Sequence, residues 1–342
     1  MRWMDGFLIF VVSLAAGLAA TWLSRRLALR FNIVDRPDNT VKTHGRPIAY
    51  LGGLGIWVGF AVGMFSLFAG EQFAGLVWFL AASVLICLVG LADDIFALSP
   101  SRKIAGQILT AALAVFFLNS HLKGVFPQLS APAAAVLSFG LLVFFVLGAS
   151  NSVNLLDGLD GLCGGVTFLI CIGFFLLASM SRSAFSSFQQ TLALSLAAAC
   201  AGFLVLNYPP ASIFMGDAGS LLIGFLLACQ MILFLLQGPA VFLASLFIFG
   251  LPILDTSVAI LRRFLNKKPL FVSDRGHIYD QLVDRGFTKT QSVWACYLLT
   301  VLFSAVGLLG FRLGLGPALP LYFLTLLITF LVIWKKDFLK KV

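Results

Sequence analysis

Long apolar runs separated by short polar connections make up most of this chain of 342 residues. A run of about 20 apolar residues is long enough to cross the hydrocarbon core of a bilayer as a helix. Such runs predict an all-α polytopic membrane protein with about 11 transmembrane helices. The expected spans are 6–24, 51–69, 76–92, 104–118, 132–149, 162–180, 191–206, 219–236, 239–261, 292–311 and 317–334.

The composition supports this membrane assignment. The mean hydropathy is +1.03 and only 11% of the residues are charged, whereas about 25% are charged in soluble domains. No polar stretch is long enough to fold separately, so we expect a single membrane-embedded domain over residues 1–342. The first span is followed by Arg25 and Arg26 rather than a cleavage site, which favours an uncleaved helix.

The distribution of basic residues predicts how the chain is oriented. When the connections are assigned to alternate sides, 19 of the 23 lysines and arginines fall on one side. The positive-inside rule then places the N-terminus outside and the C-terminus in the cytoplasm. The net charge of +9 is therefore explained by topology, and no nucleic-acid partner is expected.

Three short connections on the expected cytoplasmic side are acidic and contain glycines. They are 90–107, 151–162 and 207–220, and they contribute Asp93, Asp94, Asp157, Asp160 and Asp217. Carboxylates that converge repel one another unless a cation offsets their charge. Mg²⁺ is usually held by one or two carboxylates together with substrate phosphates. The pattern therefore indicates a magnesium and phosphate site, with Lys103, Lys42, Arg46 and His277 as candidate cationic partners.

Taken separately, each acidic motif has a simpler interpretation. An Asp-Asp pair is typical of a solvated helix end, and Asp217 could cap the helix that follows it. Adjacent positions on a helix project about 100° apart, so Asp93 and Asp94 are expected to have separate duties. Asp255 lies inside a span, where it is either a functional carboxylate or a structural hydrogen-bond acceptor. The combination of three acidic loops on one membrane face favours a site.

Five motifs resemble the polyprenyl-phosphate N-acetylhexosamine-1-phosphate transferases, which include phospho-MurNAc-pentapeptide translocase. In chain order they read KTHGRPIAYLGGLGI (42–56), LADDIFALSPSRK (91–103), NSVNLLDGLDGL (151–162), NYPPASIFMGDAGS (207–220) and DRGHIYDQL (274–282). The resemblance implies transfer of a sugar 1-phosphate from a UDP-sugar to undecaprenyl phosphate, with release of UMP. It also implies a bacterial cytoplasmic (inner) membrane location and a site facing the cytoplasm, built from residues 25–50, 92–103, 150–161, 207–218 and 262–291.

The resemblance implies a role for each motif residue. The catalytic residues would be Asp93, Asp94, Lys103 and His277, and the metal ligands Asp217 and Asp93, for Mg²⁺ or a substituting Mn²⁺. The substrate-binding residues would be Asn154, Asp157, Asp160, Asn207, Phe214, Lys42 and Arg275. Direct attack by the lipid phosphate is the expected route, with a phospho-aspartyl intermediate as the alternative.

One motif departs from the family pattern. Family members often carry further histidines after the first one, whereas this chain has Tyr279 and Asp280 close behind His277. This departure suggests the subgroup that starts O-antigen-like glycans of lipopolysaccharide, with a deoxy-amino sugar as the transferred group.

A secondary transporter or a lipid flippase is the alternative function. A transporter commonly places its binding residues at broken helices near the bilayer midplane, often with internal repeats, and this chain has no visible repeat. A transferase releases UMP in detergent, whereas a transporter needs sealed vesicles. The oligomeric state is left open by the sequence, with a homodimer as one option.

Overall fold

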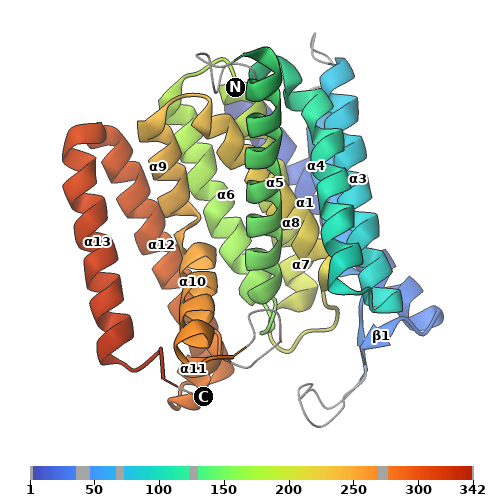
Figure 1. Cartoon of the computed structure of the whole chain (residues 1–342). Coiled ribbons are helices and arrows are strands. Elements are labelled where there is room, and N and C mark those ends of the chain that lie inside the picture. The colour runs from blue at the N-terminus through green and yellow to red at the C-terminus, as the bar shows by residue number, and fades with distance from the viewer. Residues whose placement is uncertain (1–2, 36–46, 67–72, 123–129, 269–275, 341–342) are drawn as a thin grey trace.

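The structure, a computed structural model, describes residues 3–35, 47–66, 73–122, 130–268 and 276–340. Within these ranges it is a bundle of helices whose axes run roughly along the vertical of Figure 1. The helices are α1 (Trp3–Arg30), α2 (Gly52–Met64), α3 (Phe73–Phe96), α4 (Pro100–Leu122), α5 (Ala131–Leu155), α6 (Leu162–Ser181), α7 (Ser186–Asn207), α8 (Gly216–Leu235), α9 (Pro239–Ile248), α10 (Gly250–Leu265), α11 (Ile278–Asp284), α12 (Lys289–Leu313) and α13 (Leu315–Lys335); the strands are β1 (Val34–Asp35) and β2 (Ile48–Ala49).

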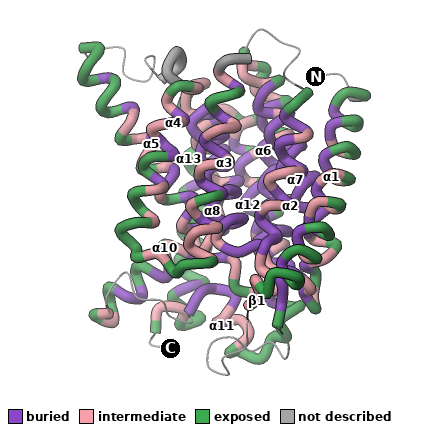
Figure 2. The backbone as a smooth tube through the Cα atoms, turned by 90° about the vertical axis from the view of Figure 1, so that its right-hand side faces the viewer, coloured by how far each residue is buried: buried purple, intermediate pink, exposed green. Residues whose placement is uncertain are grey.

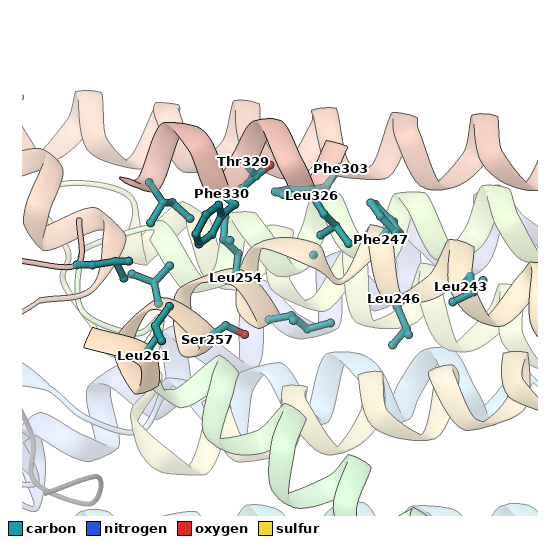
Figure 3. Close-up of a pocket in the computed structure, with 15 residues that line it drawn as sticks. Leu243, Leu246, Phe247, Leu254, Ser257, Leu261, Phe303, Leu326, Thr329 and Phe330 are labelled. Carbon is teal, nitrogen blue, oxygen red and sulfur yellow. The ribbon is translucent and has the colours of Figure 1, made fainter. Parts of the chain in front are cut away.

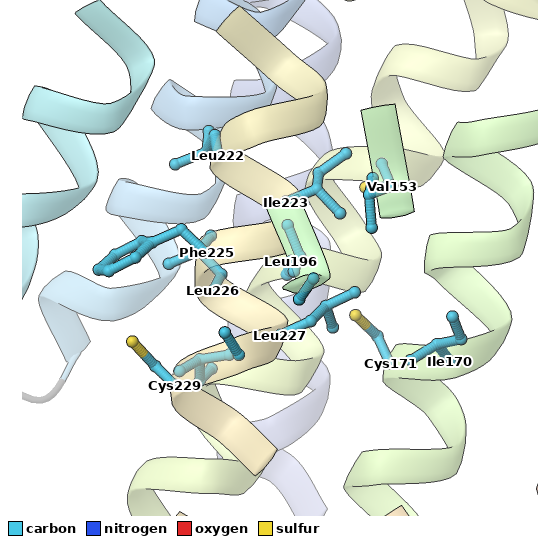
Figure 4. Close-up of a cluster of buried hydrophobic side chains, with 14 of the residues drawn as sticks. Val153, Ile170, Cys171, Leu196, Leu222, Ile223, Phe225, Leu226, Leu227 and Cys229 are labelled. Carbon is cyan, nitrogen blue, oxygen red and sulfur yellow. The ribbon is translucent and has the colours of Figure 1, made fainter. Parts of the chain in front are cut away.

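Helix α8 is the centre of the bundle. Its membrane-length window is 94% buried, compared with 17% for α13 at the edge. Side chains such as Ile223, Phe225 and Leu226 fill the space between α8 and its neighbours (Figure 4). Figure 2 shows the same division for the described residues, with buried positions inside the bundle and exposed positions on its outer helices. A helix that is apolar on every side is expected at such a central position.

The all-α membrane fold predicted from the sequence is confirmed. Among the described residues, eight helices are long and apolar enough to cross a membrane, or nine if the bent pair α9–α10 is one span. Each of the eleven predicted spans falls on a helix or on this pair. Helix α2 is shorter than the expected span 51–69, with 13 residues. Helix α4 is not among the eight, and its first two turns carry Arg102, Lys103 and Gln107.

The expected span 239–261 is two helices, α9 and α10, which meet at an angle of 70°. Gly250 begins α10, and Pro252 follows within its first turn. A proline lacks the N–H that would bond to the carbonyl four residues earlier, and its ring clashes with that carbonyl. The proline therefore accounts for the break in this apolar run.

The acidic connections all lie at one end of the bundle. The ends of α3, α5 and α7 and the starts of α4, α6 and α8 meet at the lower end of Figure 1. Helix α11 and the β1–β2 ribbon lie at this same end, and α1 begins at the opposite end (Figure 1). The fold therefore brings the three acidic loops together, as their assignment to one membrane face predicts.

The β1–β2 ribbon holds the loop that leads into α8. Strand β2 pairs antiparallel with β1, and its Ala49 also bridges to Ile213. The carbonyl of Ala49 accepts the N–H of Phe214 at 2.8 Å, and the N–H of Gly52 donates to the carbonyl of Phe214 at 2.9 Å. The loop that precedes α8 is thus held between β2 and α2.

Glycines allow α8 to approach its neighbours closely. A Cβ atom placed on Gly224 of α8 would overlap the backbone of Ser150 on α5, and one placed on Gly53 of α2 would overlap the backbone of Gly219. Small residues at helix contacts let two backbones approach, which is how helices associate in membranes.

We expect Gly224→Ala to lower thermal stability because the added methyl group forces α5 and α8 apart. Overpacking of this kind typically costs about 1–3 kcal/mol. The matched control is Gly140→Ala on α5, where an added Cβ meets no atom within 4 Å. The melting temperature in detergent, followed by intrinsic fluorescence, should fall for Gly224→Ala and stay the same or rise for Gly140→Ala. Equal melting temperatures for the two variants would contradict the close contact.

Candidate active site

Asp94 holds the first turn of α8. Its carboxylate accepts the backbone N–H groups of Asp217 at 2.8 Å and Ala218 at 3.1 Å. The first N–H groups of a helix have no partner within the helix, and the helix dipole favours negative charge there. Gly216, which precedes Asp217, has a positive φ of 66°, and a Cβ on it would overlap the Asp94 carboxylate. The glycine of the FMGD motif is therefore required by this contact.

Lys103 connects the other two carboxylates. Its Nζ lies 3.0 Å from Asp93 Oδ2, and it also donates to Asp217 Oδ2. Asp93 Oδ1 accepts the N–H of Leu98 at 2.7 Å, so Asp93 is held on the turn that follows α3. Asp93 and Asp94 thus have different partners, in agreement with the separate duties expected of adjacent helix positions.

Asn154 completes the set around Asp217. Its Nδ2 donates to Asp217 Oδ1 at 2.7 Å and to Ser220 Oγ at 2.9 Å. One carboxylate oxygen of Asp217 therefore accepts a hydrogen bond from the Asn154 amide, and the other accepts one from the Lys103 ammonium group. One turn further from the site, Asn151 Nδ2 donates to Gln107 Oε1 at 3.1 Å, and the buried Gln107 Nε2 has no hydrogen-bond partner among the residues that the structure describes.

The sequence analysis missed Gln107, Asn151 and Ser220. The available signal was spacing: Gln107 is four residues after Lys103, and Asn151 is three residues before Asn154. Residues three or four apart lie on one face of a helix. The same spacing places Ser220 near Asp217 on α8.

The loop between α5 and α6 carries Asp157 and Asp160, and the two carboxyl groups differ in their partners. Asp160 Oδ2 accepts the N–H of Ala211 at 2.9 Å. Asn207 accepts the N–H of Gly161 at 2.9 Å and donates to the carbonyl of Ile213 at 2.8 Å. Asp160 and Asn207 therefore join the two acidic loops to each other, and their predicted role in substrate binding stays a prediction.

The pKa of Asp157 is raised from 3.8 to about 8 by burial and by the negative charge of Asp217, Asp94 and Asp160. Within the described part of the chain, its carboxyl has no hydrogen-bond partner. The Asp157 carboxyl therefore lies beside three other carboxyl groups, an arrangement that a bound cation would stabilise.

The contacts of His277 are with residues outside the aspartate cluster. It is 4% exposed, its Nδ1 lies 2.7 Å from Asp255 Oδ2, and Asp255 Oδ1 accepts the N–H of Ile278 at 2.6 Å. Of the two interpretations left open for Asp255, the structure shows the hydrogen-bond acceptor. His277 is the N-cap residue that precedes α11, so the pair fastens the start of α11 to α10, and a catalytic role for His277 stays a prediction.

A polar cavity of about 680 Å³ opens beside the cluster. This volume lies in the range of about 300–1,000 Å³ that is usual for ligand sites. Phe214 lies edge-on to Tyr50, with ring centroids 6.3 Å apart. The predicted residues Lys42 and Arg275, as well as Arg46, lie outside the described residues. The cavity is lined by Asn32, Ile33, Val34, Asp35, Tyr50, Asp93, Asp94, Ile95, Ala97, Leu98 and Asp217.

A second cavity, of about 440 Å³, is apolar and lies between α9–α10, α12 and α13 (Figure 3). Leu254 and Ser257 of α10, Phe303 of α12 and Phe330 of α13 are among its lining residues. Such a lining suits hydrocarbon and offers little for phosphate or metal. The polar cavity beside Asp217 is therefore the candidate active site.

The donor set fits a divalent cation that is shared with phosphate groups. Among the described residues, no three His, Cys, Asp or Glu side chains come close enough to hold a metal ion by themselves. Mg²⁺, however, needs only one or two carboxylates when substrate phosphates and water complete its coordination. Asp93 and Asp217 both contact Lys103, and the Asp94 carboxylate lies against the helix start that carries Asp217.

The chain is similar in sequence to bacterial transferases. Residues 76–235 match the family described as glycosyl transferase family 4. A probable undecaprenyl-phosphate N-acetylglucosaminyl 1-phosphate transferase of Bacillus subtilis is 32% identical over 86% of this chain and 82% of its own. An undecaprenyl-phosphate alpha-N-acetylglucosaminyl 1-phosphate transferase of Yersinia pestis is 30% identical over 88% of this chain and 83% of its own. A decaprenyl-phosphate N-acetylglucosaminephosphotransferase of Mycolicibacterium smegmatis is 29% identical over 89% of this chain and 79% of its own.

We expect Asp157→Asn to change how stability depends on pH. Because folding raises the pKa of this carboxyl from 3.8 to about 8, the folded state binds more protons than the unfolded state between these values. The contribution of Asp157 to the stability of the wild type is therefore most favourable below about pH 4 and declines until about pH 8. With EDTA present, the melting temperature of Asp157→Asn relative to wild type should rise from about pH 5 to about pH 8 and then level off.

Asp284→Asn is the control for this measurement, because Asp284 is exposed at the end of α11. Its melting temperature relative to wild type should stay constant over the same pH range. A constant difference for Asp157→Asn as well would contradict a raised pKa at Asp157.

Proposed function

Because the chain belongs to the polyprenyl-phosphate N-acetylhexosamine-1-phosphate transferase family, we propose that it transfers a sugar 1-phosphate from a UDP-N-acetylhexosamine to undecaprenyl phosphate. The products are UMP and a lipid-linked pyrophosphate sugar that starts a cell-envelope glycan. The observation that carries this proposal is the cluster of Lys103, Asp93, Asn154 and Asp217 beside a polar cavity at one end of the bundle.

The position of the cluster suits two substrates of opposite solubility. UDP-sugars are dissolved in water, whereas undecaprenyl phosphate is held in the bilayer. The end of α3, the end of α5 and the start of α8, which carry or adjoin these aspartates, lie at one end of the bundle (Figure 1), where a water-soluble and a lipid-bound phosphate could meet. This position supports our proposal that the enzyme lies in the bacterial cytoplasmic membrane with this end facing the cytoplasm.

The chemistry is a direct displacement at phosphorus. An oxygen of the lipid phosphate bonds to the phosphorus that carries the sugar, and the bond from that phosphorus to the bridging oxygen breaks, leaving UMP. Transfer of this kind depends on positioning and charge neutralisation more than on covalent catalysis. A phosphate monoester has a second pKa near 6, so the attacking oxygen is already ionised at neutral pH.

The residues of the cluster divide this work. Lys103 supplies positive charge toward the phosphates. Asn154 orients Asp217, and Asp94 positions the same residue through the first turn of α8. Mg²⁺, held by Asp217 and Asp93, would neutralise charge on the donor pyrophosphate when bound.

Two classes of donor sugar follow from the sequence and the relatives. The relatives carry N-acetylglucosamine in their names, and the departure at Tyr279 and Asp280 favours a deoxy-amino sugar such as N-acetylfucosamine or N-acetylquinovosamine. Turnover of UDP-N-acetylglucosamine at a rate equal to or above that of each deoxy sugar would count against the second class.

We expect purified protein to release UMP only when undecaprenyl phosphate, a UDP-N-acetylhexosamine and Mg²⁺ are all present. Asp217→Asn removes the charge at the centre of the cluster, and Lys103→Gln removes its cation. Each should lower kcat by about 100-fold or more, as losses of electrostatic transition-state stabilisation do. UMP is measured by coupled assay in detergent, without any sealed compartment.

Asp337→Asn is the matched control, because Asp337 is an exposed aspartate paired with Lys340 at 3.1 Å. It should retain wild-type activity. Full activity in Asp217→Asn with an unchanged melting temperature would overturn the proposed site. UMP release by the wild type without lipid acceptor would overturn the proposed reaction.

A further inference from the structure

The acidic loop between α5 and α6 is held at both ends by tyrosine hydroxyl groups. Tyr279 of α11 donates to the carbonyl of Leu155 at 3.1 Å, and Tyr297 of α12 donates to the carbonyl of Gly161 at 2.6 Å. Leu155 is the last residue of α5, and Gly161 immediately precedes α6. The two hydrogen bonds therefore bracket the six residues 156–161, which include Asp157.

Each tyrosine also occupies space that a glycine leaves open. A Cβ on Gly158 would overlap the phenol of Tyr279, and a Cβ on Gly165 would overlap the phenol of Tyr297. The structure gives no positive φ for either glycine. Their absent side chains are thus explained by the close approach of the two tyrosine rings.

The Tyr279 ring is itself fixed by buried contacts. It stacks on His277, with centroids 5.6 Å apart and ring planes 11° apart. His277 is paired with Asp255 of α10, which is fully buried. A continuous series of contacts therefore runs from α10 through α11 to the loop.

Tyr297 provides the second attachment from a different helix. It lies on α12, edge-on to Trp294, with ring centroids 5.4 Å apart. Asp160 and Asn207 also tie the loop to the connection between α7 and α8. In the described part of the chain these bonds leave the Asp157 carboxyl without a hydrogen-bond partner.

We propose that Tyr279 and Tyr297 are positioning residues that hold residues 156–161 in the conformation in which Asp157 meets the UDP-sugar donor. This role rests on the proposed transferase function and deepens it by assigning donor binding to a loop that α11 and α12 hold in place. The two tyrosines need not touch the donor, because they act through the backbone of the loop.

The test uses Tyr279→Phe and Tyr297→Phe, which remove one hydroxyl and keep the ring. Without its hydrogen bond the loop must be ordered by the donor, at the expense of donor affinity. Loss of one such bond should raise the KM for the UDP-sugar by about three- to tenfold. The KM for undecaprenyl phosphate and the melting temperature should change little.

Gly158→Ala approaches the same contact from the loop side. Its added methyl group displaces the Tyr279 ring, so the donor KM should rise as in Tyr279→Phe. In a Tyr279→Ala background the ring is absent, and Gly158→Ala should then add little to the effect. Such non-additivity is expected of two residues in direct contact.

Tyr322→Phe is the matched control. Tyr322 of α13 donates to the carbonyl of Gly307 at 3.3 Å, and its phenol also occupies the space beside a glycine, Gly310. The chemical change is identical but lies between α12 and α13, outside the candidate active site. Its donor KM should equal that of the wild type.

Three outcomes would overturn the proposal. One is an unchanged donor KM in both Tyr279→Phe and Tyr297→Phe. Another is an equal rise in the KM values for donor and lipid. The third is the same rise in Tyr322→Phe, which would indicate a general loss of packing.

Hydrogen exchange separates this proposal from the proposed function. Peptides covering residues 156–161 should exchange faster in Tyr279→Phe and Tyr297→Phe than in the wild type or Tyr322→Phe. If the wild type released no UMP with any donor, the transferase function would fail while faster exchange still supported the attachment. Unchanged exchange in both variants would overturn the attachment itself.

Discussion

The candidate site depends on the contact between the Asp94 carboxylate and the first turn of α8. There the Asp94 carboxylate accepts two backbone N–H groups, and Asp217 faces Lys103 and Asn154. One helix end thus gathers residues from α3, α4 and α5. Helix α8 is also the most buried of the membrane-length helices that the structure describes. The candidate site is therefore built on the most enclosed helix of the bundle.

Charge explains why this end of the bundle is shaped for a ligand. Lys103 lies between Asp93 and Asp217, and Asp94 is satisfied by the helix start. Burial, together with the neighbouring carboxylates, raises the pKa of Asp157. The cluster is therefore electrostatically incomplete, and a pyrophosphate that brings its own cation would complete it.

The sequence predicted much of the fold and the members of the aspartate cluster. Long apolar runs identify membrane helices, and alternate connections determine which loops meet. The bend between α9 and α10 was missed because the run 239–261 is apolar throughout, although Pro252 was a visible signal. The partners of His277 and Tyr279 were not predictable, because contacts between distant elements leave no periodic pattern in the chain.

The attachment of the acidic loop has a consequence for how such enzymes diverge. Tyr279 and Tyr297 bond to main-chain carbonyls, which every amino acid supplies. These bonds therefore place no demand on the side chains at positions 155 and 161. Substitutions in α11 can therefore move the loop without changing the aspartates of the cluster. Under the proposed function, donor selectivity could thus be selected separately from the residues of the aspartate cluster.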